Sequence, residues 1–299
     1  MAGKPERATR AARCGGRLPH EPRRGDRLTG DKMSLDPSTI QAAAAALDAA
    51  ERNRVQIPLL SDDHPNMTMD DAYAIQAEWV RRKCAAGDDL VGFKIGLTSK
   101  AMQAALSIDI PDSGVLLRSM VFENGARIAP NRFIQPRIEA EIAFVMKAPL
   151  SGRNLTGADI LAATDHVVPA LEILDTRITR KDQRSGRLRT VLDTISDNAA
   201  NAGIVMGTPC HDFATVDLRW IGAIVARDGE VEETGLGAGV LNDPLLSVSW
   251  LADRLAAYGD RIEAGQVILS GSFIRPVEAP PGSLITADFG TLGAVECQF

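Results

Sequence analysis

Three glutamates lie within two short apolar segments, where they could support metal chemistry. The segment Arg137–Val145 (RIEAEIAFV) favours a strand, in which Glu139 and Glu141 would point to the same face. Glu172 is the single acid of a second apolar run, Val167–Leu174. Burying unpaired carboxylates is costly, and oxygen ligands suit Mg²⁺ or Mn²⁺ better than Zn²⁺. These residues predict either a divalent-cation site or, alternatively, a solvated strand face with Glu172 paired to a basic side chain.

Lys94 and Asp112 are two further candidates for chemistry. Lys94 lies in an apolar, strand-like segment that ends at Gly96. Burial lowers the pKa of a lysine, so a buried Lys94 would be a usable proton carrier near neutral pH. The alternative is a surface lysine whose stem packs while its amine reaches solvent. Asp112 follows a proline, and by itself it predicts an ordinary turn residue.

The elements that position these residues read as an α+β protein. Residues 37–54 and 70–84 favour helices, with Asp36 or Ser38 and then Thr68 as N-caps. Short apolar runs after residue 90 favour strands, and helices are expected near 156–163 and 244–258. The runs expected to be strands are Leu90–Ile95, Gly114–Leu117, Ile138–Met146, Val167–Leu174, Ala202–Met206, Ile221–Ala226, Val267–Leu269 and Ala294–Cys297. The irregular order does not favour a regular βαβ succession.

The charge distribution divides the chain into an arm and a body. Residues 1–32 hold nine Lys or Arg and four Asp or Glu, which leaves the rest at −11 because the whole chain carries −6. The arm has few large apolar residues and is expected to be disordered. It indicates either an upstream start codon with Met33 as the biological start, or a basic arm that binds polyanions. An acidic body argues against nucleic-acid and membrane-surface binding.

Cysteine spacing and hydropathy limit the class of protein further. The four cysteines lie far apart without a C-x-x-C pair, which does not favour a structural zinc site or a disulfide framework. Their pattern suits a reducing cytoplasm. No apolar stretch is long enough for a transmembrane helix. We expect a cytoplasmic protein with a helical region at 33–90 and a catalytic domain at 91–299.

Several motifs together resemble one enzyme family. They are GFKIGLTSK at 92–100, PRIEAE at 136–141, VPALEILD at 168–175, DTISDNAANAG at 193–203, VLNDP at 240–244 and GSFIRP at 271–276. From about Leu35 to Phe299 the chain resembles the fumarylacetoacetase-related superfamily, within it the hydratase/decarboxylase branch of aromatic meta-cleavage pathways. The resemblance implies a mixed β-roll fold with a small helical N-terminal region, and a homo-oligomer.

The resemblance also implies roles for individual residues. Glu139, Glu141 and Glu172 would bind Mg²⁺ or Mn²⁺, with Lys94 as the principal acid/base and Asp112 as a supporting one. Ser272 would hydrogen-bond the C1 carboxylate of the substrate, and the backbone around Gly96 and Leu97 would line the same pocket. Asn198 is a further candidate beside the site. His166 is not part of the family pattern and is interpreted as structural.

The implied reaction is the hydration of 2-oxohept-ene-1,7-dioate to 4-hydroxy-2-oxoheptanedioate in homoprotocatechuate catabolism. The cation would polarise the C2 carbonyl, Lys94 would move the proton, and water would add at C4. Residues 176–190 hold six basic residues and are either a mobile lid for the C7 carboxylate or a solvated loop. The six are Arg177, Arg180, Lys181, Arg184, Arg187 and Arg189.

Other functions remain open from the sequence alone. A 2-hydroxypenta-2,4-dienoate hydratase or a 2-oxohex-3-enedioate decarboxylase would use the same ligands. A non-catalytic partner subunit of a hydratase–decarboxylase complex is the non-enzyme alternative.

Overall fold

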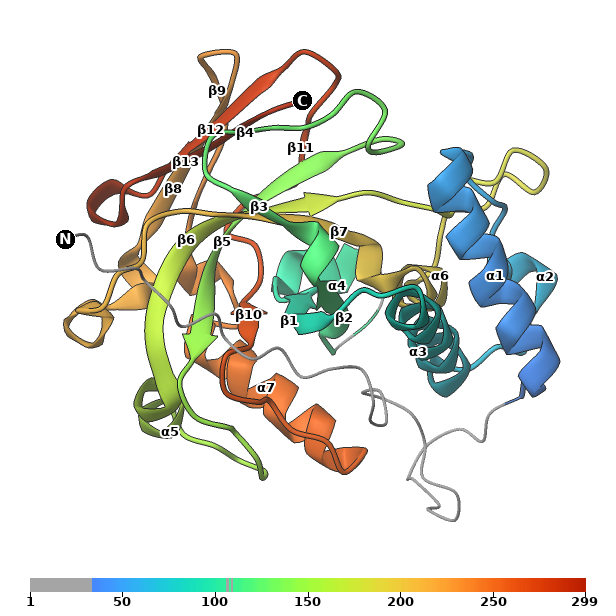
Figure 1. Ribbon diagram of the computed structural model, residues 1–299, viewed down its shortest axis with the longest axis horizontal. Helices are drawn as coiled ribbons and strands as arrows, with labels where there is room; N and C mark the ends of the chain where they lie inside the picture. Colours follow the sequence, from blue (N-terminus) through green and yellow to red (C-terminus); the bar gives the residue numbers. More distant parts are fainter. Residues whose placement is uncertain (1–33, 106–107, 109) are drawn as a thin grey trace, which may run out of the picture.

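The N-terminal region is helical and lies to one side of the sheets (Figure 1). The computed structural model describes residues 34–105, 108 and 110–299, so the basic arm at 1–32 lies outside the described residues. Asp36 caps α1 and Thr68 caps α3 in a capping box with Asp71, as the sequence predicts. The helices are α1 (Pro37–Asn53), α2 (Leu60–Asp63) and α3 (Met69–Ala85).

The larger sheet is mixed and strongly curved. Its strands run in the order β2-β1-β10-β5-β6-β7-β3, and β11 pairs with β5 outside this path. The pairs β1–β10 and β3–β7 are parallel, and the others are antiparallel. The bounds are β1 (Leu90–Gly96), β2 (Asp112–Leu117), β3 (Val121–Glu123), β5 (Arg137–Met146), β6 (Thr164–Leu174), β7 (Asn201–Met206), β10 (Val267–Leu269) and β11 (Val277–Glu278).

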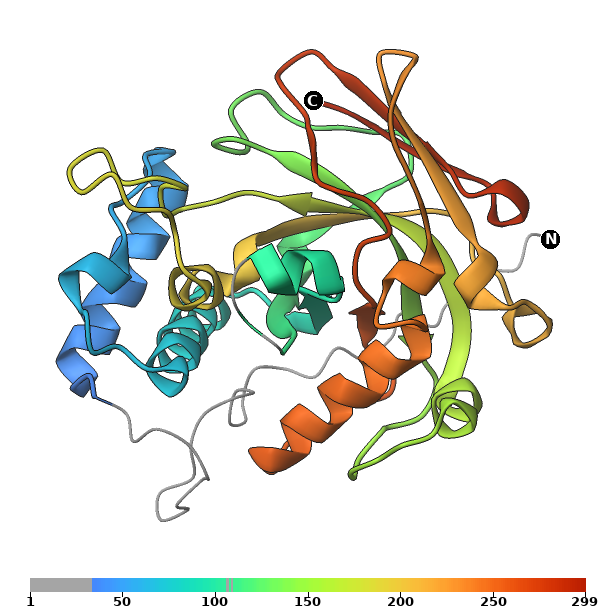
Figure 2. The same cartoon turned by 180° about the vertical axis from the view of Figure 1, so that it is seen from behind.

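A second, five-stranded sheet is stacked on the first, and most of its strands appear in orange and red at the top of Figure 2. Its order is β4-β13-β12-β8-β9. Buried side chains from both sheets join one hydrophobic core, which also includes α1 and α3. The bounds are β4 (Ala126–Arg127), β8 (Gly222–Arg227), β9 (Glu230–Leu236), β12 (Leu284–Asp288) and β13 (Ala294–Gln298).

Four more helices complete the fold. Thr156 and Thr190 each form a capping box with an aspartate three residues on, and Asp243 caps α7, which begins with a proline. The bounds are α4 (Lys100–Ala105), α5 (Gly157–Ala163), α6 (Val191–Ser196) and α7 (Pro244–Ala257). None of the helices in the described part of the chain is long and apolar enough to span a bilayer.

One face of the larger sheet carries the residues of interest. The register places Asp112 opposite Gly96, Gly114 opposite Lys94 and Glu139 opposite Glu172, so these side chains share that face. Farther along the same strands, the face is apolar. A small separate cluster there contains Leu116, Ala143, Val168, Ala170, Ile204 and Leu269. The polar site therefore lies next to a small hydrophobic cluster, which packs the strands together.

Most of the expected strands and helices are confirmed, with ends shifted by one to three residues. The elements that were not predicted from the sequence are β3, β4, β9, β11, β12, α2, α4 and α6. These elements are very short, or polar along much of their length. Strand β9, for example, reads EVEETGL and is mostly exposed.

Candidate active site and metal centre

The three glutamates converge, as the sequence predicted. Glu139 and Glu172 are directly opposed on β5 and β6, and Glu141 follows two residues along the same face. One carboxylate oxygen from each residue lies within 4.8 Å of the others. The solvated strand face is wrong, because Glu141 and Glu172 are fully buried and Glu139 is partly buried. The other part of that alternative, an ion pair of Glu172 with a basic side chain, is confirmed by Lys94.

These carboxylates lack sufficient partners among the described residues. Both oxygens of Glu172 and Oε1 of Glu141 are buried without a hydrogen-bond donor. Burial, the charge of Glu172 and other nearby charges raise the pKa of Glu139 to about 8. Burial and both neighbouring glutamates raise the pKa of Glu141 well above its usual value. Three converging, poorly hydrated carboxylates fit a hard divalent cation such as Mg²⁺ or Mn²⁺.

Lys94 extends into the same cluster. Its Nζ lies 3.6 Å from Glu172 Oε1, and the side chain is 5% exposed, which rules out the surface-lysine alternative. The predicted lowering of its pKa is wrong. Burial does act to lower the pKa of Lys94, but Glu172, Asp112, Glu139 and Glu141 outweigh it and hold the pKa above its ordinary value. In the metal-free protein Lys94 is therefore an ammonium ion.

Asp112 is a buried site residue as well as the first residue of β2. Burial raises its pKa, while the positive charges of Lys94, Arg189 and Arg254 act in the opposite direction. Gly96 keeps the space between the two groups open. A Cβ on Gly96 would lie 2.2 Å from Asp112 Oδ1 and 3.0 Å from Lys94 Nζ, so no larger residue fits without displacing them.

Two backbone segments border the cluster. The N–H of Gly271 donates to Glu141 Oε2 at 2.8 Å, and Gly271 has φ 117°, which favours glycine. Leu97 adopts the left-handed region at φ 56°, an uncommon conformation for a bulky residue and one often found at functional sites. The hydroxyl of Ser272, one residue after Gly271, donates to the carbonyl of Ile274 at 2.8 Å. Its proposed substrate contact would require this hydroxyl to rotate.

Asn198 supports the strand that carries Asp112. Its side-chain amide donates to the Val115 carbonyl at 2.9 Å and accepts from the Val115 N–H at 2.8 Å. It is buried, and it lies in a turn whose residues 198–200 all have positive φ. The side chain therefore positions β2 through its backbone.

The basic segment 176–190 forms a hairpin, closed by a bridge between Lys181 and Leu188, and its residues have different surroundings. Arg177 is 2% exposed, forms an ion pair with Asp197 and donates to the Asn201 carbonyl at 3.1 Å. Its guanidinium also lies 5.5 Å from the ring centre of Trp79. Arg177 is thus a structural residue, contrary to the hypothesis that it contacts substrate.

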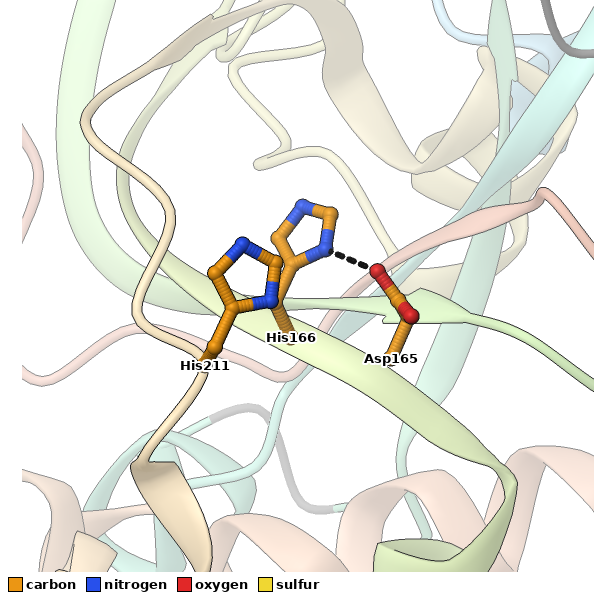
Figure 3. A group of neighbouring side chains, drawn as sticks. All are labelled: Asp165, His166 and His211. Carbon is orange, nitrogen blue, oxygen red and sulfur yellow. Dashed lines mark hydrogen bonds and ion pairs between the residues drawn. The ribbon is translucent and has the colours of Figure 1, made fainter. Parts of the chain in front are cut away.

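A second group of candidate ligands, Asp165, His166 and His211, lies on β6 and on the loop after β7 (Figure 3). His166 Nδ1 and Asp165 Oδ2 form a hydrogen bond of 2.7 Å, and Asp165 and His211 are exposed. Six residues separate His166 from Glu172, or roughly 20 Å along a strand. His166 is therefore not part of the glutamate cluster.

Two residues of the site, Gly271 and Arg254, were not identified from sequence. Gly271 gave a weak signal because it follows a strand-like run. Arg254, which lies 3.9 Å from the ring centre of Tyr73, gave none, because it reads as an ordinary polar position of α7.

A curled mixed sheet with three clustered glutamates and a buried lysine defines the class as divalent-metal enzymes of the fumarylacetoacetate hydrolase fold. The fold is shared with a putative fumarylacetoacetate hydrolase family protein from Yersinia pestis CO92, at a TM-score of 0.51 and 11% identity over 70% of this chain and 93% of that one. A scan against models of known protein families finds no match.

Two similarities at higher identity define the family. The chain is 52% identical to 2-oxo-hept-4-ene-1,7-dioate hydratase of Escherichia coli, covering 89% of this chain and 99% of the relative. It is 36% identical to 4-oxalocrotonate decarboxylase of Pseudomonas putida G7 in complex with magnesium and adipate, with a TM-score of 0.84 and coverage of 90% and 100%. The chain belongs to this family of meta-cleavage hydratases and decarboxylases.

Proposed function

We propose that this protein is a metal-dependent hydratase that converts 2-oxohept-ene-1,7-dioate into 4-hydroxy-2-oxoheptanedioate. The observation that carries the proposal is the cluster of Glu139, Glu141 and Glu172 with Lys94 at 3.6 Å from Glu172. The 52% identity to a hydratase of this substrate class supports it.

The three glutamates would hold a divalent cation, Mg²⁺ or Mn²⁺. When bound, such a cation supplies Lewis-acid stabilisation of negative charge on the 2-oxo acid. The neighbouring N–H of Gly271 keeps the Glu141 carboxylate in place through its 2.8 Å hydrogen bond. A magnesium complex of the related decarboxylase is consistent with this choice of metal.

Lys94 and Asp112 would perform the proton transfers. The ammonium of Lys94 can donate a proton to a substrate carbon once substrate displaces its contact with Glu172. Asp112, held beside it by the β1–β2 register, can orient water or return the proton. Ser272 and the backbone at Leu97 would bind the C1 carboxylate end of the substrate. Water adds at C4, and C3 receives a proton.

The test is turnover of 2-oxohept-ene-1,7-dioate followed by ultraviolet absorbance of the conjugated enone. We expect activity with Mg²⁺, loss of activity with EDTA, and recovery when Mg²⁺ is restored in excess. Activity that EDTA leaves unchanged would overturn the metal assignment. Absence of turnover with this substrate would overturn the substrate assignment.

The second candidate is decarboxylation of an unsaturated 2-oxo dicarboxylate. The 36% identity and shared fold of the 4-oxalocrotonate decarboxylase favour it, and the same glutamates would serve. Release of CO₂ from 2-oxohex-3-enedioate, without addition of water, would support this alternative. We further propose that the enzyme works in the cytoplasm as a homo-oligomer.

A further inference from the structure

Two partly buried arginines of the 176–190 hairpin, Arg180 and Arg189, lie side by side. The Arg189 N–H donates to the Arg180 carbonyl at 2.9 Å, and the next pair, Lys181 and Leu188, forms a β-bridge. Adjacent residues of a strand point to opposite faces, so Arg180 and Arg189 share one face. Lys181 and Leu188 are exposed on the other, whereas both arginines are partly buried.

Neither arginine has a carboxylate within ion-pair distance in the part of the chain that the structure describes. Two other arginines of the hairpin do form ion pairs. Arg184 pairs with Asp182 at 2.9 Å, and Arg187 pairs with Asp62 at 2.5 Å. Among the residues that the structure describes, the Arg180 guanidinium donates only to Gln135, at 2.8 Å to Oε1 and 3.3 Å to the carbonyl. Nη1 of Arg189 is buried with no acceptor among the described residues.

Partly buried cations without a counter-ion are unfavourable unless an anion joins them. The pKa of Arg180 reflects this excess of positive charge. Burial and the like charges of Arg137 and Arg189 lower it to about 10, although Asp175 and Glu278 act to raise it. Planar guanidinium groups bind carboxylates well because two parallel hydrogen bonds can form.

The length of a suitable ligand follows from Arg137, which lines the same cavity as Arg180 and lies on the strand that carries Glu139. Arg180 and Arg137 both line a cavity of about 340 Å³. Arg137 shares a face of β5 with Glu139, two residues or roughly 7 Å away. A seven-carbon chain has six bonds between its end carbons. Two residues of extended backbone also contain six bonds, so the extended length of the chain is about 7 Å as well. Arg189 lies on the same face of the hairpin as Arg180, and its positive charge acts to lower the pKa of Asp112.

We propose that Arg180 and Arg189 form the subsite for the second carboxylate of an unsaturated 2-oxo dicarboxylate. This inference rests on the proposed function and extends it, because it names the residues that select dicarboxylates over monocarboxylates. Arg137 already pairs with Glu278 at 2.9 Å and borders the subsite.

Kinetics of Arg180→Gln and Arg189→Gln test the proposal, with 2-oxohept-ene-1,7-dioate and the monocarboxylate 2-oxopent-4-enoate as substrates. We expect kcat/KM for the dicarboxylate to fall about 10- to 100-fold, the range for lost hydrogen bonds to a charged group. The monocarboxylate value should change less than about twofold, so selectivity falls. Arg187→Gln, on the same hairpin but paired outward with Asp62, is the matched control. Equal losses for both substrates, or an equal loss in the control, would overturn the proposal.

A binding measurement separates failure of this inference from failure of the proposed function. Calorimetry measures the affinity of heptanedioate, a saturated seven-carbon dicarboxylate, for the Mg²⁺-loaded protein and the three variants. Weaker binding in Arg180→Gln and Arg189→Gln alone supports the subsite even if the wild-type protein shows no hydration. Unchanged binding in both variants, with their folding verified by circular dichroism, contradicts it even if hydration is observed.

Discussion

Lys94 Nζ lies 3.6 Å from Glu172 Oε1 although two strands, β10 and β5, separate their own strands in the sheet. Neighbouring strands are about 4.8 Å apart, so the two backbones would be roughly 14 Å apart in a flat sheet. Both side chains extend across the same face and meet over it. The contact joins the proposed proton carrier to the proposed metal centre.

Replacing Lys94 with Met should remove the proton carrier and keep the side-chain volume. We expect kcat to fall by roughly 10²- to 10⁴-fold, the usual contribution of a positioned acid or base. Binding of Mg²⁺ should persist or strengthen, because a positive charge next to the three carboxylates is lost. Calorimetric Mg²⁺ titration and initial rates measure both effects. A kcat within tenfold of wild type would exclude Lys94 as the principal acid/base.

Glu141→Gln should change stability and metal binding in opposite directions. Burial and the two neighbouring glutamates disfavour the ionised form of Glu141, and glutamine carries no charge, so the metal-free protein should become more stable, by about 1 kcal/mol. Affinity for Mg²⁺ should drop at least about tenfold. Losing a residue that only contacts a metal ligand already costs about that much, and Glu141 is a proposed ligand itself.

Glu172→Gln is the informative comparison, because Glu172 also contacts Lys94. Its loss should weaken Mg²⁺ binding without stabilising the metal-free protein. Thermal melts with EDTA measure the stability of the metal-free variants, and calorimetry measures their affinity for Mg²⁺. Equal stabilisation by both variants would mean that the Lys94–Glu172 contact contributes little.

Stability of the metal-free protein should decrease as the pH rises toward 8. The pKa of Glu139 is raised from 4.5 to about 8 on folding, so the folded state retains a proton that the unfolded chain has released. That contribution is fully present below pH 4.5 and is lost as the pH rises through about 8. With Mg²⁺ bound, the carboxylates are ionised and this loss should disappear. The gap in Tm between Mg²⁺ and EDTA samples should therefore widen with pH, and a constant gap would contradict the assignment.

Gly96→Ala should reduce kcat about 100-fold while the protein still folds. The added Cβ would lie 2.2 Å from Asp112 Oδ1 and 3.0 Å from Lys94 Nζ, so one or both groups must move. Displacements of about 1 Å can reduce a rate about 100-fold. Gly239→Ala is the control, because its Cβ would meet no atom within 4 Å. Wild-type kcat in Gly96→Ala would show that the two groups need not be held as they are.

Arg177→Met should destabilise the fold and leave substrate preference unchanged. The variant leaves Asp197 buried without its cation, which commonly costs about 3–5 kcal/mol. Loss of the exposed Arg187–Asp62 pair in Arg187→Gln should cost no more than about 1 kcal/mol. Denaturant unfolding compares the two. A small effect for Arg177→Met would require another role for this arginine.

The local features of the fold were predictable from the sequence. Caps at Asp36 and Thr68, and the alternation around Glu139 and Glu141, follow from rules that act within a few residues. The convergence with Glu172 was identified from apolar context and family resemblance together. The order of the strands depends on contacts between distant segments, as in the pairing of Lys94 on β1 with Leu269 on β10.

The errors also have physical causes. The pKa of Lys94 was predicted from burial alone, whereas its direction depends on four carboxylates supplied by three other strands. The six basic residues of 176–190 looked equivalent in sequence. The hairpin register and the positions of Asp62 and Asp197 separate them, so that Arg177 is structural, Arg187 faces outward and Arg189 faces inward.

The most direct measurement is the identity of the product formed from 2-oxohept-ene-1,7-dioate by the Mg²⁺-loaded protein, from mass spectrometry and proton NMR. Hydration at the glutamate–lysine site predicts a gain of one water, a new C4 carbinol proton and two protons at C3. No such product should form with EDTA or in Lys94→Met. Loss of CO₂ without addition of water would contradict the hydratase assignment, and the same product from the EDTA-treated enzyme would contradict the metal centre.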